Sequence, residues 1–227
     1  MAKKKSGGTR DNLLSAASDI FADKGFRDAT VAEICQRAGA NIAAVNYYFG
    51  SKEALYQEAW RHAFAGSIAA HPPDGGIAAD APAAERLGGQ VRALIARIAD
   101  EDNRDFLISQ MEFINPTGLL AEVMRSAMNP LRENTLAVVR ELLGPDMPEQ
   151  SVNYCETCTI SMCFHPMLIQ RIRRRVNDNG GPPAIEDIAA FADHVLRFAL
   201  AGIAAIRGDA SPGYPVAPSA GTNPSIP

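Results

Sequence analysis

The chain has 227 residues, of which 47% are hydrophobic and 21% are charged, so it can bury a substantial core. Its formal net charge of −4 excludes a protein that coats nucleic acid with its whole surface. Residues 1–66 carry a charge balance of +2 and residues 67–227 a balance of −6. The charges therefore predict a weakly basic N-terminal module on an acidic body.

The first 60 residues contain four short helical patterns that follow a basic, flexible arm at 1–9. Gly25 is a typical stop for the first helix, and Thr30 with Glu33 forms a capping box that opens the second. Asn41 and Ser51 are suitable caps for the two helices that follow. The expected helices cover 10–24, 30–39, 41–49 and the stretch from 51 onward.

A turn-rich stretch at 71–82 separates these helices from the rest of the chain. Pro130 and Pro166 lie inside helical patterns of the body and are expected to kink or split those helices. No alternating strand pattern is longer than a few residues, so the predicted fold class is all-α. The body helices are expected at 83–101, 103–114, 117–143, 148–176 and 184–207, before a Pro/Ser/Gly-rich, disordered tail at 208–227.

Residues 30–52 have the pattern of a helix-turn-helix, in which two short helices meet at a tight turn. Gly39 suits that turn, and Ile34 and Val45 are the apolar residues that hold the helices together. Asparagine can bond the edge of an adenine, tyrosine hydroxyls can donate to phosphates, and a lysine at a helix start can meet a phosphate. The residues expected to contact double-stranded DNA are Thr30, Asn41, Ile42, Ala43, Ala44, Asn46, Tyr47, Tyr48 and Lys52.

The run TVAEICQRAGANIAAVNYYFGSKEALYQEAW, within residues 10–60, resembles the DNA-binding domain of TetR-type repressors. A looser similarity, carried by NIAAVNYYFGSKEALY and by NPLRENTLAVVRELLG in the body, is to the cefoperazone/chloramphenicol-sensitivity regulator branch. The resemblance implies a helix-turn-helix domain at 10–55, followed by a helical ligand-binding and dimerisation domain at 56–207. It also implies a repressor that binds palindromic operator DNA as a homodimer and is released by a small apolar effector.

The start of the third helix departs from the wording that is common in the family. Ile42, Ala43 and Ala44 are apolar where a serine or threonine is usual, and Asn46 stands where a tyrosine is usual. Few groups are then left for direct hydrogen bonding to bases. Methyl contacts to thymine and the sequence-dependent shape of DNA are expected to contribute more of the specificity.

Methionine and phenylalanine recur through the body, where flexible thioethers can line a pocket for an apolar effector. Packing in an ordinary core is the alternative interpretation. The candidate pocket residues are Phe106, Met111, Met124, Met128, Met162 and His165. The last two helices are expected to form the dimer, through an apolar face that includes Ile188, Phe191, Val195, Phe198 and Ile203.

Three cysteines, Cys155, Cys158 and Cys163, crowd one expected helix together with His165. One straight helix cannot wrap four ligands around a tetrahedral metal ion, so we expect these cysteines in the core or dimer interface, with no metal or cofactor. Three alternatives stay open: a ligand-binding module that has lost sequence-specific DNA binding, a regulator that responds to thiol oxidation, and an activator or nucleoid-architectural protein. No nucleophile–base pair stands in a setting suited to chemistry, so an enzyme is not expected.

Two further features of the sequence indicate where in the cell the protein is located. Residues 3–5 are basic, but Ser6-Gly7-Gly8 follows where a secretion signal needs an apolar run. The longest apolar stretch near the C-terminus, at 198–206, is about half of the roughly 20 residues that a membrane span requires. We therefore expect a cytoplasmic protein that does not enter a membrane.

Overall fold

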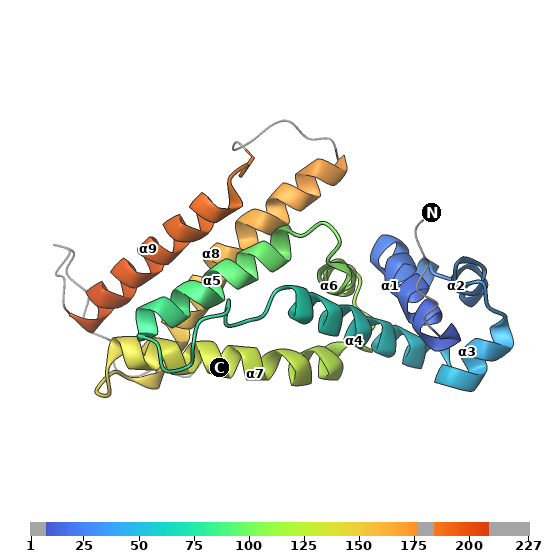
Figure 1. Cartoon of the computed structure of the whole chain (residues 1–227), viewed down its shortest axis with the longest axis horizontal. Coiled ribbons are helices and arrows are strands. Elements are labelled where there is room, and N and C mark those ends of the chain that lie inside the picture. Colours follow the sequence, from blue (N-terminus) through green and yellow to red (C-terminus); the bar gives the residue numbers. More distant parts are fainter. Residues whose placement is uncertain (1–7, 177–183, 209–227) are drawn as a thin grey trace, which may run out of the picture.

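The computed structural model describes residues 8–176 and 184–208, and these ranges form nine helices (Figure 1). Figure 1 shows α1–α3 gathered at one end of the molecule and most of the remaining helices at the other, with α4 leading between them. The all-α prediction is confirmed, and each expected helix is present within a few residues of its expected bounds. The helices are α1 (Thr9–Asp28), α2 (Val31–Ala38), α3 (Ile42–Phe49), α4 (Lys52–Ala70), α5 (Ala83–Ala99), α6 (Arg104–Ile114), α7 (Ala121–Leu143), α8 (Glu149–Val176) and α9 (Ile188–Arg207).

Two parts of the predicted organisation lie largely outside the described residues. The basic arm was expected at 1–9, and of these only residues 8 and 9 are described, with Thr9 already beginning α1. The disordered tail was expected at 208–227, of which only Gly208 is described, as the C-cap of α9. The other predicted boundary, between residues 55 and 56, falls inside α4.

Side-chain caps fix the ends of the two shortest helices, α2 and α3. The Thr30 hydroxyl accepts from the Glu33 amide at 3.2 Å, and the Glu33 carboxylate accepts from the Thr30 amide at 3.1 Å, which confirms the capping box. Asn41 Oδ1 accepts from the Ala44 amide at 2.9 Å. Gly39 adopts a left-handed conformation, with φ at 65°, at the turn between them. Helices of eight residues are unstable alone, so these caps and the packing below them hold the pair in place.

Helix α1 is interrupted at Gly25, whose φ of 73° and ψ of 178° are not helical. The expected stop at Gly25 is therefore present as a break, after which the helix resumes to Asp28. A β-carbon at this position would lie 3.1 Å from Met111 Cε, so the glycine also permits α6 to approach closely. This contact places Met111 against the first helix.

Pro130 and Pro166 lie inside α7 and α8, and each helix continues through its proline. The prolines therefore do not split the helices, and the alternative that they kink them stays a prediction. In α7 the residues before the proline pack in one core, as Val123 does, and those after it pack in another, as Leu136 and Val139 do. Burial on both sides outweighs the cost of about 3 kcal/mol for an internal proline.

Two apolar cores organise the molecule, and α6 contributes to both. The first joins α1–α4 to α6 and the beginning of α7, and the second joins α5–α9. Ile108 of α6 belongs to the first core, while Phe106 of the same helix belongs to the second. Helix α6 packs against α1 and α4. The three-helix head, α1–α3, is thus anchored to the body by shared packing.

Candidate nucleic-acid interface and ligand cavity

Helix α3 turns one anchor inward and presents most of its other side chains to solvent. Val45 is 1% exposed and locks the helix to the head, and Phe49 packs partly against the same core. On the opposite side Ile42 is 54% exposed and Tyr47 is 82% exposed. The remaining exposed members of this face are Ala43, Asn46 and Tyr48, while Ala44 is half-buried.

The two tyrosines of α3 hold each other in a defined arrangement. Their ring centroids are 4.9 Å apart, and the rings meet edge to face at 79°. Tyr48 also lies 6.2 Å from the Phe49 ring, which links this pair to the core of the head. Both phenol groups are therefore carried on rings whose positions are restrained by neighbours.

Thr30 and Asn41 serve as helix caps, which limits what else they can bind. The Thr30 hydroxyl donates to Glu33 Oε2 at 3.0 Å, and the pKa of the Glu33 carboxyl is lowered by hydrogen bonds from Lys24 and Thr30. A phosphate at Thr30 would therefore meet a nearby negative charge. Asn41 uses its side-chain oxygen for the cap, which leaves its amide nitrogen available as a donor.

Cations flank α3 on the helices before and after it. Lys52 is the first residue of α4, and its Nζ lies 4.5 Å from the centroid of the Phe26 ring. Arg10 of α1 lies 5.4 Å from the Phe49 ring and is paired with Glu58 at 3.0 Å. Lys52 could be predicted from the sequence but Arg10 could not, because only the packing of α1 against α3 brings Arg10 beside the exposed face.

The body contains a cavity of about 450 Å³ between α4, α5, α6, α7 and α8. Its volume is within the range of sites that hold small molecules. Residues from all five helices contribute to walls that are mostly apolar. Among them are Leu87, Val91, Ile98, Phe106, Leu131 and Phe164.

Two of the six predicted pocket residues, Phe106 and Met128, line this cavity. The other four do not line it. On α7, Met124 and Met128 are one turn apart and both pack against the first core, but only Met128 also lines the cavity. Met111 lies beside Gly25, Met124 joins the first core, Met162 packs partly against the second core, and His165 is exposed.

One side of the cavity contains a buried ion pair that no pattern in the sequence predicted. Arg97 Nη2 lies 2.5 Å from Asp105 Oδ2, and Arg97 Nε donates to the Ser67 hydroxyl at 2.7 Å. Asp105 is 1% exposed, and burial raises the pKa of its carboxyl while Arg97 and Ser67 act in the opposite direction. The sequence gives no sign of this burial, since Asp105 stands in the first turn of a helix, where exposed acidic residues are common.

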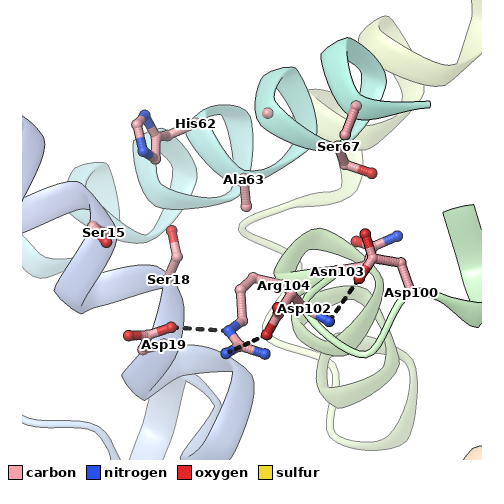
Figure 2. A pocket seen from close by; sticks show the side chains of 12 residues that line it. Ser15, Ser18, Asp19, His62, Ala63, Ser67, Asp100, Asp102, Asn103 and Arg104 are labelled. Atoms are coloured by element: carbon pink, nitrogen blue, oxygen red, sulfur yellow. Dashed lines mark hydrogen bonds and ion pairs between the residues drawn. The ribbon is translucent and has the colours of Figure 1, made fainter. Parts of the chain in front are cut away.

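A second, polar cleft of about 290 Å³ lies where the head meets the body (Figure 2). Figure 2 shows Arg104, at the start of α6, reaching Asp19 of α1, with Arg104 Nε 2.9 Å from Asp19 Oδ1. The other oxygen of Asp19 accepts from Arg37 of α2 at 2.7 Å. Asn103 lines both this cleft and the body cavity. Neighbouring residues of α6 thus contact the head, through Arg104, and the cavity, through Asp105.

The cysteines do not form a reactive cluster. Cys155 and Cys163 are buried in the second core, and Cys158 is exposed. Burial raises the pKa of the Cys163 thiol to about 12, and burial together with Cys158 raises the pKa of Cys155. Because the thiolate is the form that reacts with oxidants, these shifts disfavour regulation by thiol oxidation at neutral pH.

At pH 8, the folded protein is expected to react rapidly with an aromatic disulfide reagent at no more than one thiol, that of Cys158. Cys35, Cys155 and Cys163 are buried, and their raised pKa values keep them protonated well above neutral pH. All four thiols should react after unfolding in guanidinium. Absorbance of the released thiolate measures both counts, and rapid reaction of two or more thiols in the folded protein would restore the redox alternative.

Helix α9 is largely uncovered in the protomer. Within the described residues it is the one helix that is long and apolar enough to cross a membrane by length and composition, and 22% of its apolar 18-residue window is buried. Val195 and Ile203, which were predicted for the dimer face, instead pack in the protomer's own core, and Ile188 and Phe191 pack partly against it. Phe198, on the other side, is 65% exposed. The apolar face of α9 is therefore divided between its own body and solvent.

Comparison with known families divides the chain into two matched regions. Residues 13–59 match the model described as bacterial regulatory proteins, tetR family. Residues 83–203 match the C-terminal domain of the HTH-type transcriptional dual regulator CecR. The second region covers more than half of the chain, and it corresponds to α5–α9 almost in full. Both resemblances noted in the sequence are thus confirmed.

Individual relatives agree with these family matches. The chain is 31% identical to CecR of Shigella flexneri over 156 residues, which is 60% of this chain and 66% of CecR. It is 40% identical to the repressor NicS of Pseudomonas putida over 57 residues, 25% of this chain and 27% of NicS. These alignments span less than two thirds of either relative.

Solved structures show the same fold at low identity. A TetR-like regulator from Rhodococcus sp. RHA1 has a TM-score of 0.64 at 17% identity and covers 86% of this chain and 96% of its own. FadR from Bacillus subtilis, solved in complex with stearoyl-CoA, has a TM-score of 0.62 at 17% identity and covers 85% of this chain and 98% of its own. The solved structures share the fold, and the two family matches show that the chain belongs to the TetR family of bacterial transcriptional regulators, which are not enzymes, and carries a CecR-type C-terminal domain.

Proposed function

We propose that the chain is a cytoplasmic, dimeric repressor that binds palindromic operator DNA through α3 and releases it when a small apolar molecule fills the body cavity. The observation that carries this proposal is the division of α3 into a buried anchor, Val45, and an exposed face that includes Ile42, Asn46 and Tyr47. An α-helix fits the major groove, where exposed side chains can read base edges.

The side chains of this face suit different parts of the duplex. Asn46 can bond the edge of an adenine, while the methyl groups of Ile42 and Ala43 can contact thymine. The Tyr47 and Tyr48 hydroxyls, on their restrained rings, can donate to phosphates. The Asn41 side-chain nitrogen and the Lys52 ammonium at the start of α4 can also donate to phosphates. The Thr30 hydroxyl and the Ala44 amide, which are already engaged in helix caps, would reach a phosphate only by sharing those hydrogen bonds.

A dimer follows from the exposed apolar surface of the last helix. Phe198 and Ile206 of α9 are at least half exposed, and Ile172 of α8 is 44% exposed. Pairing of α8 and α9 with the same helices of a second copy would cover these residues in a two-fold interface. Two copies of α3 would then have to lie about 34–36 Å apart to enter successive major grooves.

Helix α6 would transmit the effect of ligand binding in the cavity to the DNA-binding head. Its first residue, Arg104, is paired with Asp19 of the head, and its second, Asp105, is paired with Arg97 in the cavity wall. Asp19 in turn is paired with Arg37 of α2, which packs directly against α3. A ligand that moves α6 would therefore change the position of the head, and with it the spacing between the two copies of α3.

The names of the relatives support regulation at the level of transcription. NicS is named a transcriptional repressor and CecR a transcriptional dual regulator. FadR, which shares this fold, was solved in complex with stearoyl-CoA, a ligand with a long apolar acyl chain, and this supports a ligand-binding role for the fold.

The test is a binding selection from random duplex DNA, followed by measurement of affinity against salt for the selected site. We expect a palindrome with half-sites about one turn, or 10 base pairs, apart, because the two copies of α3 are related by two-fold symmetry. Affinity should fall steeply with salt, since each phosphate contact releases condensed counterions. Recovery of no enriched site would favour the alternative of a module that has lost sequence-specific DNA binding.

A further inference from the structure

The ion pair in the wall of the body cavity leaves a hydrogen-bond acceptor unused. Asp105 Oδ2 accepts from Arg97, whereas no donor among the described residues is in hydrogen-bonding geometry with Asp105 Oδ1. The side chain is 1% exposed and lines the cavity. Gln90 Oε1 lines the same cavity and is also buried without a partner. Buried acceptors are nearly always paired in folded proteins, so these two atoms mark a place for a donor.

The two arginines in the wall of the cavity already have acidic partners. Arg97 is matched by Asp105, and Arg132 Nε lies 3.5 Å from Oε1 of the buried Glu156. At the rim, His71 is hydrogen-bonded to Asp100 at 2.9 Å, and the exposed Asp74 accepts from the Gly76 amide. A charged group held inside the cavity would therefore have to compete with one member of an existing ion pair for the other, which is unfavourable.

We propose that the cavity takes an uncharged, largely apolar molecule with one hydroxyl or amide N–H group, which donates to Asp105 Oδ1. Asp105 sets this requirement because a carboxylate in an ion pair with Arg97 can only accept, whereas the amide of Gln90 can rotate to present either oxygen or nitrogen. The inference rests on the proposed function of the cavity as the effector site. It adds the chemical class of the effector and the residue that selects it.

The protein carries its own reporter for occupancy of the cavity. Trp60 is the single tryptophan of the chain, and it is fully buried. Its indole Nε1 donates to the Ser109 hydroxyl at 2.9 Å, and Ser109 lines the cavity. A molecule that enters the cavity should therefore change the emission of Trp60.

The test compares three probes of equal chain length: 1-decanol, decyl methyl ether and decanoate. Titration of the full chain, followed by Trp60 emission and by calorimetry, should show that decanol binds about tenfold tighter than the ether. Decanoate should bind no more tightly than the ether, because its charge would have to compete with an existing ion pair. Equal binding of alcohol and ether, tightest binding of decanoate, or no binding of decanol up to its solubility limit would each overturn the inference.

A variant identifies the atom responsible. In Asp105→Asn, the amide oxygen should turn toward Arg97, which has only donors, so the amide nitrogen would face the ligand. The preference for alcohol over ether should then disappear or reverse, while in the matched variant Gln90→Leu it should persist. An unchanged preference in folded Asp105→Asn would overturn the role of Asp105, and the wild-type comparison stands if this variant does not fold.

The proposed function of the cavity as the effector site is tested independently of the donor requirement. It is tested by the affinity for the selected DNA site with and without saturating decanol. If decanol binds with the expected preference but leaves DNA affinity unchanged, the donor requirement stands and the effector role of the cavity falls. If another compound releases DNA while the three probes bind alike, the effector role stands and the donor requirement falls.

Discussion

Substitution of Ala43 by glutamate should weaken operator binding by about hundredfold or more, which corresponds to roughly 3 kcal/mol. Ala43 lies on the exposed face of α3, where a carboxylate would face the negatively charged groove and the flanking phosphates. The free energy of unfolding should change little. The residue is the second of its helix, where a negative charge is favourable, and its side chain has no packing to lose.

The matched control is Ala65→Glu, which places the same exposed charge in the middle of α4. Electrophoretic mobility shift or fluorescence anisotropy with the selected site should give near wild-type affinity for this variant. Chemical denaturation of both variants checks that they are folded. If Ala43→Glu binds as tightly as Ala65→Glu, α3 does not enter the groove and the assignment of the DNA-binding face is wrong.

Truncation of Trp60 to alanine should lower the free energy of unfolding by about 3–5 kcal/mol, the range for large aromatic residues in cores. Trp60 is fully buried in the first core, stacks on Phe64 with centroids 5.0 Å apart, and donates to Ser109 of α6. The substitution leaves a cavity at the point where α4 meets α6, together with a buried hydroxyl that has lost its donor.

Tyr47→Ala is the control, because it removes an aromatic ring of comparable size that is 82% exposed, and its effect on unfolding should stay within about 0.5 kcal/mol. Denaturant unfolding followed by circular dichroism at one fixed protein concentration measures both, since stability of a dimer depends on concentration. A loss below about 1 kcal/mol for Trp60→Ala would mean that the junction of α4 and α6 is loosely packed.

The helix-turn-helix could be predicted from sequence almost completely, for a physical reason. Its ends are set by local interactions, such as Thr30 with Glu33 and Asn41 with Ala44, and these depend only on residues three positions apart. Its packing needs one inward residue per short helix, Ile34 and Val45, and both are buried as expected.

The lining of the cavity could not be predicted in the same way, because it depends on which residues of other helices each side chain meets. Periodicity places Met124 and Met128 on similar faces of α7, and both pack against the first core, yet only Met128 also lines the cavity. Similarly, Val195 and Ile203 belong to an apolar face whose inner half alone is covered by the protomer. Sequence shows that a face is apolar but does not show what covers it.

The buried carboxylates of the cavity wall could not be predicted from the sequence at all. Asp105 and Glu156 look like ordinary exposed acidic residues in the sequence, and only tertiary packing pairs them with Arg97 and Arg132. Such pairs join residues of different helices, so no local pattern marks them. The polar side of the cavity becomes visible only when the helices are assembled.

The first core has a consequence for how regulators of this kind can be recombined. It extends beyond the helix-turn-helix to Ile108, Leu120 and Val123, so the DNA-binding part cannot be transferred to another body without losing part of its core. A chimaera joined between residues 55 and 56, or cut anywhere along α4, would pair Tyr56 and Trp60 with foreign partners. Exchange of operator specificity is better achieved by transplanting only the outward residues of α3, which leaves every buried contact with its own partner.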